Sequence, residues 1–275
     1  MVTLQTSSTT VLEVKRLRGR SVPVTCRPGQ GMKLFHPRTE DWCHTLTSTY
    51  GGGFVDGDHL ELEITCGPGS KLCLSSTGFA QIFKGASSQS TRVKLEGDAF
   101  ALVIGQPLVP HANSKFTQRS IWEMDAESSL ISIDWLTAGR VARGESFEFQ
   151  ELLTDLEIRR SEKLVLKDRF LANPELSSFR NNSSFGTYQA LITVTLLGPK
   201  VEKLASTLNA FWNSDIGPQR AAQAPTRLTS FARLPKGGYQ LRAASNQRRE
   251  LLEVERCVVD QLRASGELDF NPVQS

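Results

Sequence analysis

The stretch STYGGGFVDGDHLELEITC, residues 48–66, sets three glycines and an Asp-Gly-Asp turn in front of a strict alternation of apolar and polar residues. From Leu60 onward the apolar side chains recur at every second position, which places them on one face of a β-strand. The glycines can be interpreted as a phosphate-binding loop, as part of a metal site, or as a tight turn before the strand. The alternation predicts a half-buried strand in all three cases.

The glycines do not fit a phosphate-binding loop. Such a loop requires a lysine followed by serine or threonine, and a dinucleotide fingerprint requires a helix after the glycines. Here a strand follows and that lysine is missing. An EF-hand fits no better, because Asp56 and Asp58 lack the further oxygen donors of that loop. On this stretch alone, turn hydrogen bonds to the two aspartates are favoured over metal binding.

The same two-residue period recurs along most of the chain, with turn signals such as CGPGSK at roughly ten-residue spacing. It predicts a strand-rich region from about residue 10 to 198, arranged as stacked antiparallel sheets. No internal repeat or linker is evident, so a single domain over residues 1–275 is expected. The expected strands include LELEITC (60–66), KLCLSS (71–76), TRVKLEG (91–97), FALVIG (100–105), LISIDWL (130–136), SFEFQELL (146–153), LEIRRSEKLVLKDRF (156–170) and QALITVTLLG (189–198).

Helical spacing of apolar residues appears only near the C-terminus. It predicts helices at about 200–213 and 246–265, the second with Ser245 as its N-cap and Gly266 just past its end. The Pro/Ala/Gln-rich segment between them, 213–230, is expected to be an exposed loop.

Composition excludes several classes of protein. With 39% hydrophobic and 22% charged residues and a net charge of +3, the chain resembles an ordinary globular protein and gives no sign of a nucleic-acid partner. No segment has the roughly 18 apolar residues of a membrane span, and the first residues lack the apolar core of a secretory signal. The five cysteines form no C-x-x-C pair, which argues against a disulfide framework and a structural zinc site. A reducing, cytoplasmic location is expected.

A few polar residues stand out as candidates for chemistry. Asp134 interrupts the apolar run LISIDWLTAGR, and Asp168 ends the alternating KLVLKDRF. A carboxylate in such a place is costly unless it is paired, protonated or bound to a cation. Arg140, six residues beyond Asp134, is the obvious partner for an ion pair. His59, beside Asp58, could contribute an imidazole to a transient metal site, although a surface histidine at a strand start is the simpler interpretation.

Three blocks follow one another in the sequence: YGGGFVDGD with the strand after it, the proline-containing FALVIGQPLVPHANSKFTQ, and LISIDWLTAGRVARGESFEF. In this order they resemble the urease accessory protein family called UreD, or UreH in some organisms. The segment from Ser75 to Lys84 also resembles a family motif, with Gln81 where lysine is usual and Phe83 where tyrosine is usual. The motif residues matched are Gly52, Gly53, Gly57, Gly139, Arg140, Gly144 and Glu145.

The resemblance implies a non-enzymatic chaperone that inserts nickel into urease. Proteins of this family form a complex with the accessory protein UreF and the GTPase UreG on apo-urease, and conduct Ni²⁺ toward the urease active site. The implied fold is β-helix-like with two helices, and no tightly bound cofactor is expected. By position, Asp58, His59, Asp134 and Asp168 match the family's transient Ni²⁺ path, although His59 stands where an acidic residue is common.

Two other functions remain open from the residues. A metal-dependent hydrolase could use Asp58, Asp134 and Asp168, but the absence of a histidine pair or a G-x-S-x-G motif weighs against it. A β-sheet interaction module without metal transfer would be favoured if the aspartates are paired with arginines.

Overall fold

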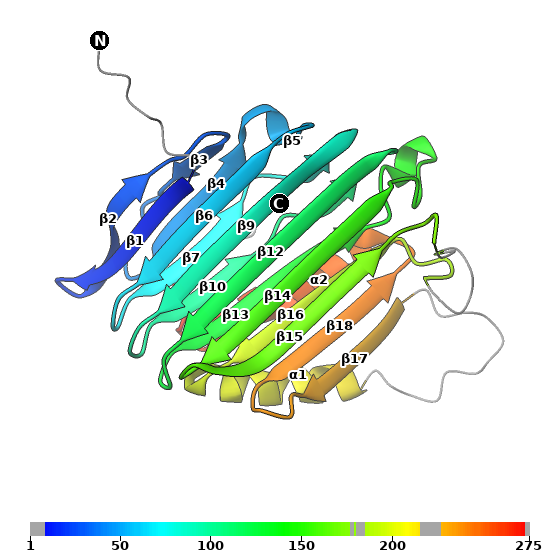
Figure 1. The fold of residues 1–275 in the computed structure, drawn as a ribbon. Coiled ribbons are helices and arrows are strands. Elements are labelled where there is room, and N and C mark those ends of the chain that lie inside the picture. The colour runs from blue at the N-terminus through cyan, green and yellow to red at the C-terminus, as the bar shows by residue number, and fades with distance from the viewer. Residues whose placement is uncertain (1–8, 177–178, 180–184, 215–226, 273–275) are drawn as a thin grey trace, which may run out of the picture.

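Two β-sheets lie face to face, and two helices cover the outer face of one of them in the computed structural model (Figure 1). The structure describes residues 9–176, 179, 185–214 and 227–272. No helix within these ranges is long and apolar enough to cross a membrane.

The first sheet has seven strands in the order β15-β14-β12-β9-β6-β1-β2. Its β6 contains the alternating LELEITC, and the side chains at Leu60, Leu62 and Ile64 are buried as that alternation predicts. The strands are β1 (Thr9–Leu17), β2 (Arg20–Arg27), β6 (His59–Cys66), β9 (Gly85–Leu95), β12 (Ser114–Met124), β14 (Glu151–Arg160) and β15 (Lys163–Ala172).

The second sheet follows the order β17-β18-β16-β13-β10-β7-β4-β3, and three short strands branch from this path. The long strands are β3 (Met32–Phe35), β4 (Cys43–Thr49), β7 (Lys71–Ser76), β10 (Phe100–Ile104), β13 (Ser129–Thr137), β16 (Ala190–Leu197), β17 (Arg227–Arg233) and β18 (Tyr239–Ser245). The short strands are β5 (Gly53–Phe54), β8 (Ala80–Ile82) and β11 (Leu108–Pro110).

The middle of the chain winds as a coil. Each turn passes from the second sheet through a short strand to the first sheet, as in β4-β5-β6, β7-β8-β9 and β10-β11-β12, and successive turns pair in parallel. Cys43 lies beside Leu72, and Lys71 beside Phe100, so each turn advances the chain by 29 residues (72 − 43 and 100 − 71). No repeat was evident in the sequence, because few residue types recur at this spacing and the repeat consists mainly of the register between strands.

The mainly-β, β-helix-like fold with two C-terminal helices is confirmed. Antiparallel pairing, which the strand spacing favoured, is confined to the first and last strands of the chain, such as β1-β2, β14-β15 and β16-β18. A parallel pair needs a crossover connection, which the short third strand supplies in each turn.

The two helices are α1 (Glu202–Ser214), preceded by the 3₁₀ turn η3 (Pro199–Val201), and α2 (Arg248–Ala264). Both lie within two residues of the predicted bounds. The N-cap of α2 is Gln247 and not Ser245, which is the last residue of β18 and whose Oγ donates a hydrogen bond to Glu250 Oε2 at 2.6 Å. Gly266 follows the helix with a φ of +76°, as expected.

The segment 213–230 was expected to be an exposed loop, and this expectation is wrong at its end. β17 begins at Arg227 and pairs with β18, so strands continue well beyond residue 198. β17 is an edge strand with an exposed Leu228, which explains its weak apolar signal. Residues 215–226 lie outside the described residues.

Two hydrophobic cores result from this arrangement. The first lies between the sheets and the second between the second sheet and the helices, where the α2 side chains Leu251, Val254, Val258 and Leu262 are buried. Cys66 and Cys73 are fully buried on their strands. The inner core is not apolar throughout, and its polar part is the candidate site.

Candidate functional site

A cavity of about 220 Å³ lies between the two sheets. Its walls combine apolar side chains with an unusual number of polar ones for the interior of a β-sandwich. From the first sheet come Gln89, Thr91, Gln118, Ser120, Thr154 and Asp168, and from the second sheet Thr47, Ser76, Ser132, Asp134, Thr193 and Arg242.

The 29-residue register explains why these polar side chains are neighbours. Positions one turn apart lie side by side in parallel strands, so equivalent residues of successive turns form rows across a sheet. One inner row of the first sheet consists of Leu60, Gln89, Gln118 and Thr154. The adjacent inner row consists of Leu62, Thr91, Ser120, Leu156 and Asp168. The amide and hydroxyl residues of these rows were not predicted from the sequence. The 29-residue spacing of Gln89 and Gln118, and of Thr91 and Ser120, is the signal that could have found four of them, whereas Thr154 follows Gln118 at 36 residues.

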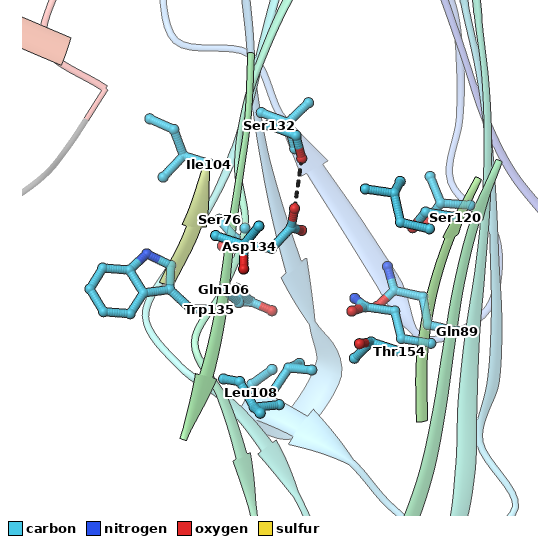
Figure 2. Close-up of a pocket in the computed structure, with 18 of the residues that line it drawn as sticks. Ser76, Gln89, Ile104, Gln106, Leu108, Ser120, Ser132, Asp134, Trp135 and Thr154 are labelled. Carbon is cyan, nitrogen blue, oxygen red and sulfur yellow. Dashed lines mark hydrogen bonds between the residues drawn. The ribbon is translucent and has the colours of Figure 1, made fainter. Parts of the chain in front are cut away.

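Asp134 projects from β13 into this cavity, and Figure 2 shows it pointing across the space toward Gln89 and Thr154 on the opposite wall. Its Oδ2 accepts a hydrogen bond from Ser132 Oγ at 2.9 Å. Gly105 lies directly beside it, because Gly105 N–H donates to the carbonyl of Ile133 at 2.8 Å. A glycine at this place leaves the space next to the carboxylate open.

The Asp134 carboxyl is enclosed by the two sheets, yet its surface is exposed to the cavity. Burial raises its pKa to about 6, the hydrogen bond from Ser132 lowers the pKa, and the negative charge of Asp168 raises it again. Both aspartates therefore share one electrostatic environment. At neutral pH the cavity contains a partly desolvated carboxylate, for which a cation is the natural counter-charge.

The other face of β13 is anchored to α2. Trp135 points away from the cavity (Figure 2), and its indole Nε1–H donates to Glu255 Oε2 at 2.7 Å. Glu255 is only 7% exposed, and this burial raises the pKa of its carboxyl. The hydrogen bond fixes the strand from which Asp134 projects, so α2 supports the cavity wall from behind.

Asp168 reaches the cavity from β15 and is paired with an arginine. Its Oδ2 accepts hydrogen bonds from Arg242 at 2.7 Å and from Gln240 Nε2 at 3.1 Å, both on β18. Arg242 lies in the same row of the second sheet as Thr193 and Asp134. These contacts bridge the two sheets, since β15 and β18 belong to different sheets.

Asp58 and His59 lie away from the cavity wall. Asp58 Oδ2 accepts a hydrogen bond from the N–H of Val55 at 2.8 Å, as in the turn interpretation. His59 is exposed at the start of β6, with Nδ1 at 2.5 Å from Ser88 Oγ and Nε2 at 3.4 Å from Glu61 Oε1. The structure thus brings together Asp134 and Asp168 but not Asp58 and His59.

Asp56 is also bound in the turn. Its Oδ1 accepts a hydrogen bond from the N–H of Ala86 at 2.8 Å. Among the residues that the structure describes, no three His, Cys, Asp or Glu side chains are grouped closely enough to hold a metal ion.

Arg140 does not pair with Asp134, contrary to the expectation from the sequence. Its guanidinium binds Glu145 through two hydrogen bonds, with Nε to Oε2 at 2.8 Å, and Oε2 also accepts from the N–H of Ala112 at 3.2 Å. Gly139 precedes it with a φ of +128°, and an added Cβ would lie 2.9 Å from the carbonyl oxygen of Pro110. The motif from Gly139 to Glu145, which includes the 3₁₀ turn η2 (Val141–Arg143) and Gly144, therefore fastens this loop onto the end of β11.

Gln81 and Phe83, the two departures from the family motif, meet at one histidine. Nε2 of His111 lies 2.7 Å from Gln81 Oε1, and its ring packs edge-on against Phe83. Both altered positions therefore contact the same side chain, at the short-strand side of the coil.

The raised pKa of Asp134 leads to a pH-dependent stability prediction. Asp134→Asn is expected to raise the Tm at pH 7.5 and to leave it nearly unchanged at pH 4. Ionised Asp134 destabilises the fold above its folded-state pKa of about 6, whereas below the unfolded value of about 3.9 the neutral acid carries no such cost. Calorimetry at the two pH values checks this, and equal Tm differences at both would contradict it.

Comparison with known proteins finds urease accessory proteins in each case. A family model described as UreD urease accessory protein matches residues 7–271. The chain is 24% identical to "Urease accessory protein UreD" of Cytophaga hutchinsonii over 96% of both chains. It is 26% identical to "Urease accessory protein D" of Arabidopsis thaliana over 70% of this chain and 68% of the relative. It is also 26% identical to "Urease accessory protein UreH" of Helicobacter pylori strain J99, over 64% of this chain and 67% of the relative.

Proposed function

Because this chain belongs to the UreD family of urease accessory proteins and so has a role in urease maturation, we propose that it is a non-enzymatic chaperone that conducts Ni²⁺ through the cavity between its sheets. In this proposal it acts in a complex with UreF-type and UreG-type proteins on apo-urease. The observation that carries the proposal is Asp134, a carboxylate enclosed by both sheets but open to a polar-lined cavity.

The chemistry of the cavity wall supports passage of a cation more than its storage. Asp134 offers carboxylate oxygens, and the hydroxyl of Ser132 and the amides of Gln89 and Gln118 offer weaker neutral donors along the wall. Ni²⁺ prefers nitrogen and sulfur ligands for tight binding, so oxygen donors of this kind would hold it weakly enough for release. Asp134 is therefore proposed as the main Ni²⁺ contact, with Asp168 as a second contact at the edge of the cavity.

Asp58 and His59 have a weaker case within the same proposal. Asp58 lies in the turn before β6 and His59 is the exposed first residue of that strand, so any contact with Ni²⁺ there would occur outside the cavity, for example where the ion arrives or leaves. The cytoplasmic location expected from the sequence stays a prediction.

The interaction module without metal transfer is favoured by one observation, the ion pair between Asp168 and Arg242. An aspartate satisfied by an arginine needs no metal to justify its position. Asp134 is different, because its hydrogen-bond donor is the neutral Ser132. Equilibrium dialysis of the purified chain against Ni²⁺ separates the two functions, since the module predicts no Ni²⁺ binding that depends on Asp134.

Complex formation provides a separate test. When the chain is co-expressed with a UreF-type protein, we expect the two to elute together in size-exclusion chromatography, and urease to gain activity only when both are present. Physical support comes from the large, rigid surface of a coiled β-fold, which suits a scaffold. A chain that stays soluble but never elutes with its partner would contradict the scaffold role.

A further inference from the structure

Polar contacts tie the two sheets together along the β15 and β18 edge. Arg242 and Gln240 of β18 both donate to Oδ2 of Asp168 on β15, and Lys236 Nζ donates to the backbone carbonyl of Leu164 at 2.8 Å. The first of these contacts is an ion pair of 2.7 Å. It joins strands of different sheets, so side chains and not backbone pairing hold this edge.

This ion pair is part of the cavity wall. Asp168 and Arg242 both line the space into which Asp134 projects. Asp134, Thr193 and Arg242 occupy one row on adjacent strands β13, β16 and β18, which places Arg242 about 10 Å from Asp134 at the usual strand spacing. The side chain of Arg242 is 49% exposed and that of Asp168 is 22% exposed, so the pair lies where the cavity meets solvent.

The guanidinium has two effects on a cation at this place. It occupies a carboxylate oxygen that a divalent cation would need as a ligand, and its positive charge repels an approaching ion. Because the arginine is half exposed, swinging it into water costs little. The pair is thus firm enough to compete with a weakly bound cation and loose enough to open.

We propose that Arg242 is a latch at this edge of the cavity, a built-in cation that occupies Asp168 and must be displaced before a divalent cation can pass this point toward Asp134. The inference rests on the proposed function, because it assumes that a divalent cation uses the cavity. It adds a residue that restricts access, and it makes the Asp168–Arg242 contact the step at which access is controlled.

Titration of the full-length chain with Ni²⁺, using a chromophoric chelator as competitor, tests the latch. Arg242→Gln is expected to raise the association constant for Ni²⁺ by about threefold to tenfold, since it removes a competing ion pair of modest strength. Arg242→Lys keeps the charge and should stay within about twofold of the wild type. In the Asp168→Asn background, the gain in affinity from Arg242→Gln should be smaller, because the competition for the Asp168 carboxylate is already absent and only the charge repulsion is left to remove.

Arg159→Gln is the matched control. Arg159 is 44% exposed and also forms a 2.7 Å ion pair, with Glu157, but it does not line the cavity. Its replacement should leave Ni²⁺ affinity unchanged. Thermal unfolding of each variant checks that the fold persists. If Arg242→Gln gained Ni²⁺ affinity only because the structure had loosened, Arg242→Lys would show the same gain.

The possible outcomes distinguish the proposed role of Arg242 from the proposed conduction of Ni²⁺ through the cavity. If Arg242→Gln binds Ni²⁺ no more tightly than Arg159→Gln, while Asp134→Asn still loses binding, the latch is wrong and the proposed function stands. If neither the wild type nor any variant binds Ni²⁺, both are wrong. If Arg242→Gln and Arg242→Lys gain affinity equally, the positive charge is not what restricts access and the latch is overturned.

Discussion

Urease matured with the Asp134→Asn variant is expected to contain at least about tenfold less nickel than urease matured with the wild-type chain. Asn keeps the size of the side chain and can accept the hydrogen bond from Ser132, but it removes the charge that attracts a cation into the cavity. Loss of one contact to a metal or to its ligands typically costs 10- to 100-fold in affinity or activity, from which we take about tenfold as the lower bound. Nickel per urease active site, measured by atomic absorption, gives the result directly.

Two controls make this prediction specific. Glu157→Gln also removes a carboxylate from the first sheet, but Glu157 pairs with Arg159 and Lys167 away from the cavity, so normal nickel loading is expected. The Asp134→Asn chain should still elute with the UreF-type protein, because the substitution is enclosed between the sheets. Normal nickel loading by this variant would contradict the conduction of Ni²⁺ through the cavity, whereas loss of the complex would show that Asp134 has a structural role.

The second large effect is expected at Gly53, in the glycine run that precedes β6. Gly53→Ala should lower the free energy of unfolding by about 3 kcal/mol, the upper part of the range for overpacking. An added Cβ would lie only 2.1 Å from the carbonyl oxygen of Gln81, and the backbone there cannot yield easily because β5 and β8 are paired at these residues. For a chain of this size the loss corresponds to a Tm decrease of roughly 6–12 °C.

The adjacent glycine is the control for this prediction. Gly52 has a φ of +74°, but an added Cβ would have no atom within 4 Å, so Gly52→Ala costs only the conformational term, about 1 kcal/mol. Differential scanning calorimetry should therefore rank the wild type above Gly52→Ala and Gly52→Ala above Gly53→Ala. An equal Tm for the two variants would show that the contact between β5 and β8 relaxes freely.

Some features of this fold follow from local patterns. The alternation in β6 identified the buried face of that strand, and the spacing of Leu251, Val254 and Val258 identified α2 within two residues. These patterns depend only on the side-chain period of a strand or helix, which neighbours along the chain determine. β17 escaped detection because an edge strand buries little on either face.

Asp134 shows how far the candidate site could be predicted. Its place in an apolar strand indicated from the sequence that it needed a partner or a cation. The sequence did not indicate the partner, and Arg140, the nearest arginine along the chain, binds Glu145 instead. Arg140 was the obvious choice from the sequence because it is close along the chain, but closeness along the chain does not determine which side chains are close in space.

The sequence by itself determined the strand faces, the two helices and the unusual position of the carboxylates at Asp134 and Asp168. Tertiary structure alone decided that these two share one cavity, that Gln89 and Gln118 face them, and that Arg242 reaches Asp168 across the sheets. The physical reason is pairing between distant strands. Gln89 and Gln118, 29 positions apart, become neighbours because successive turns of the coil pair in parallel, whereas antiparallel pairing of β15 with β14 and of β18 with β16 places Asp168 and Arg242. Local patterns fix which way a side chain points, whereas pairing between distant strands fixes what it meets.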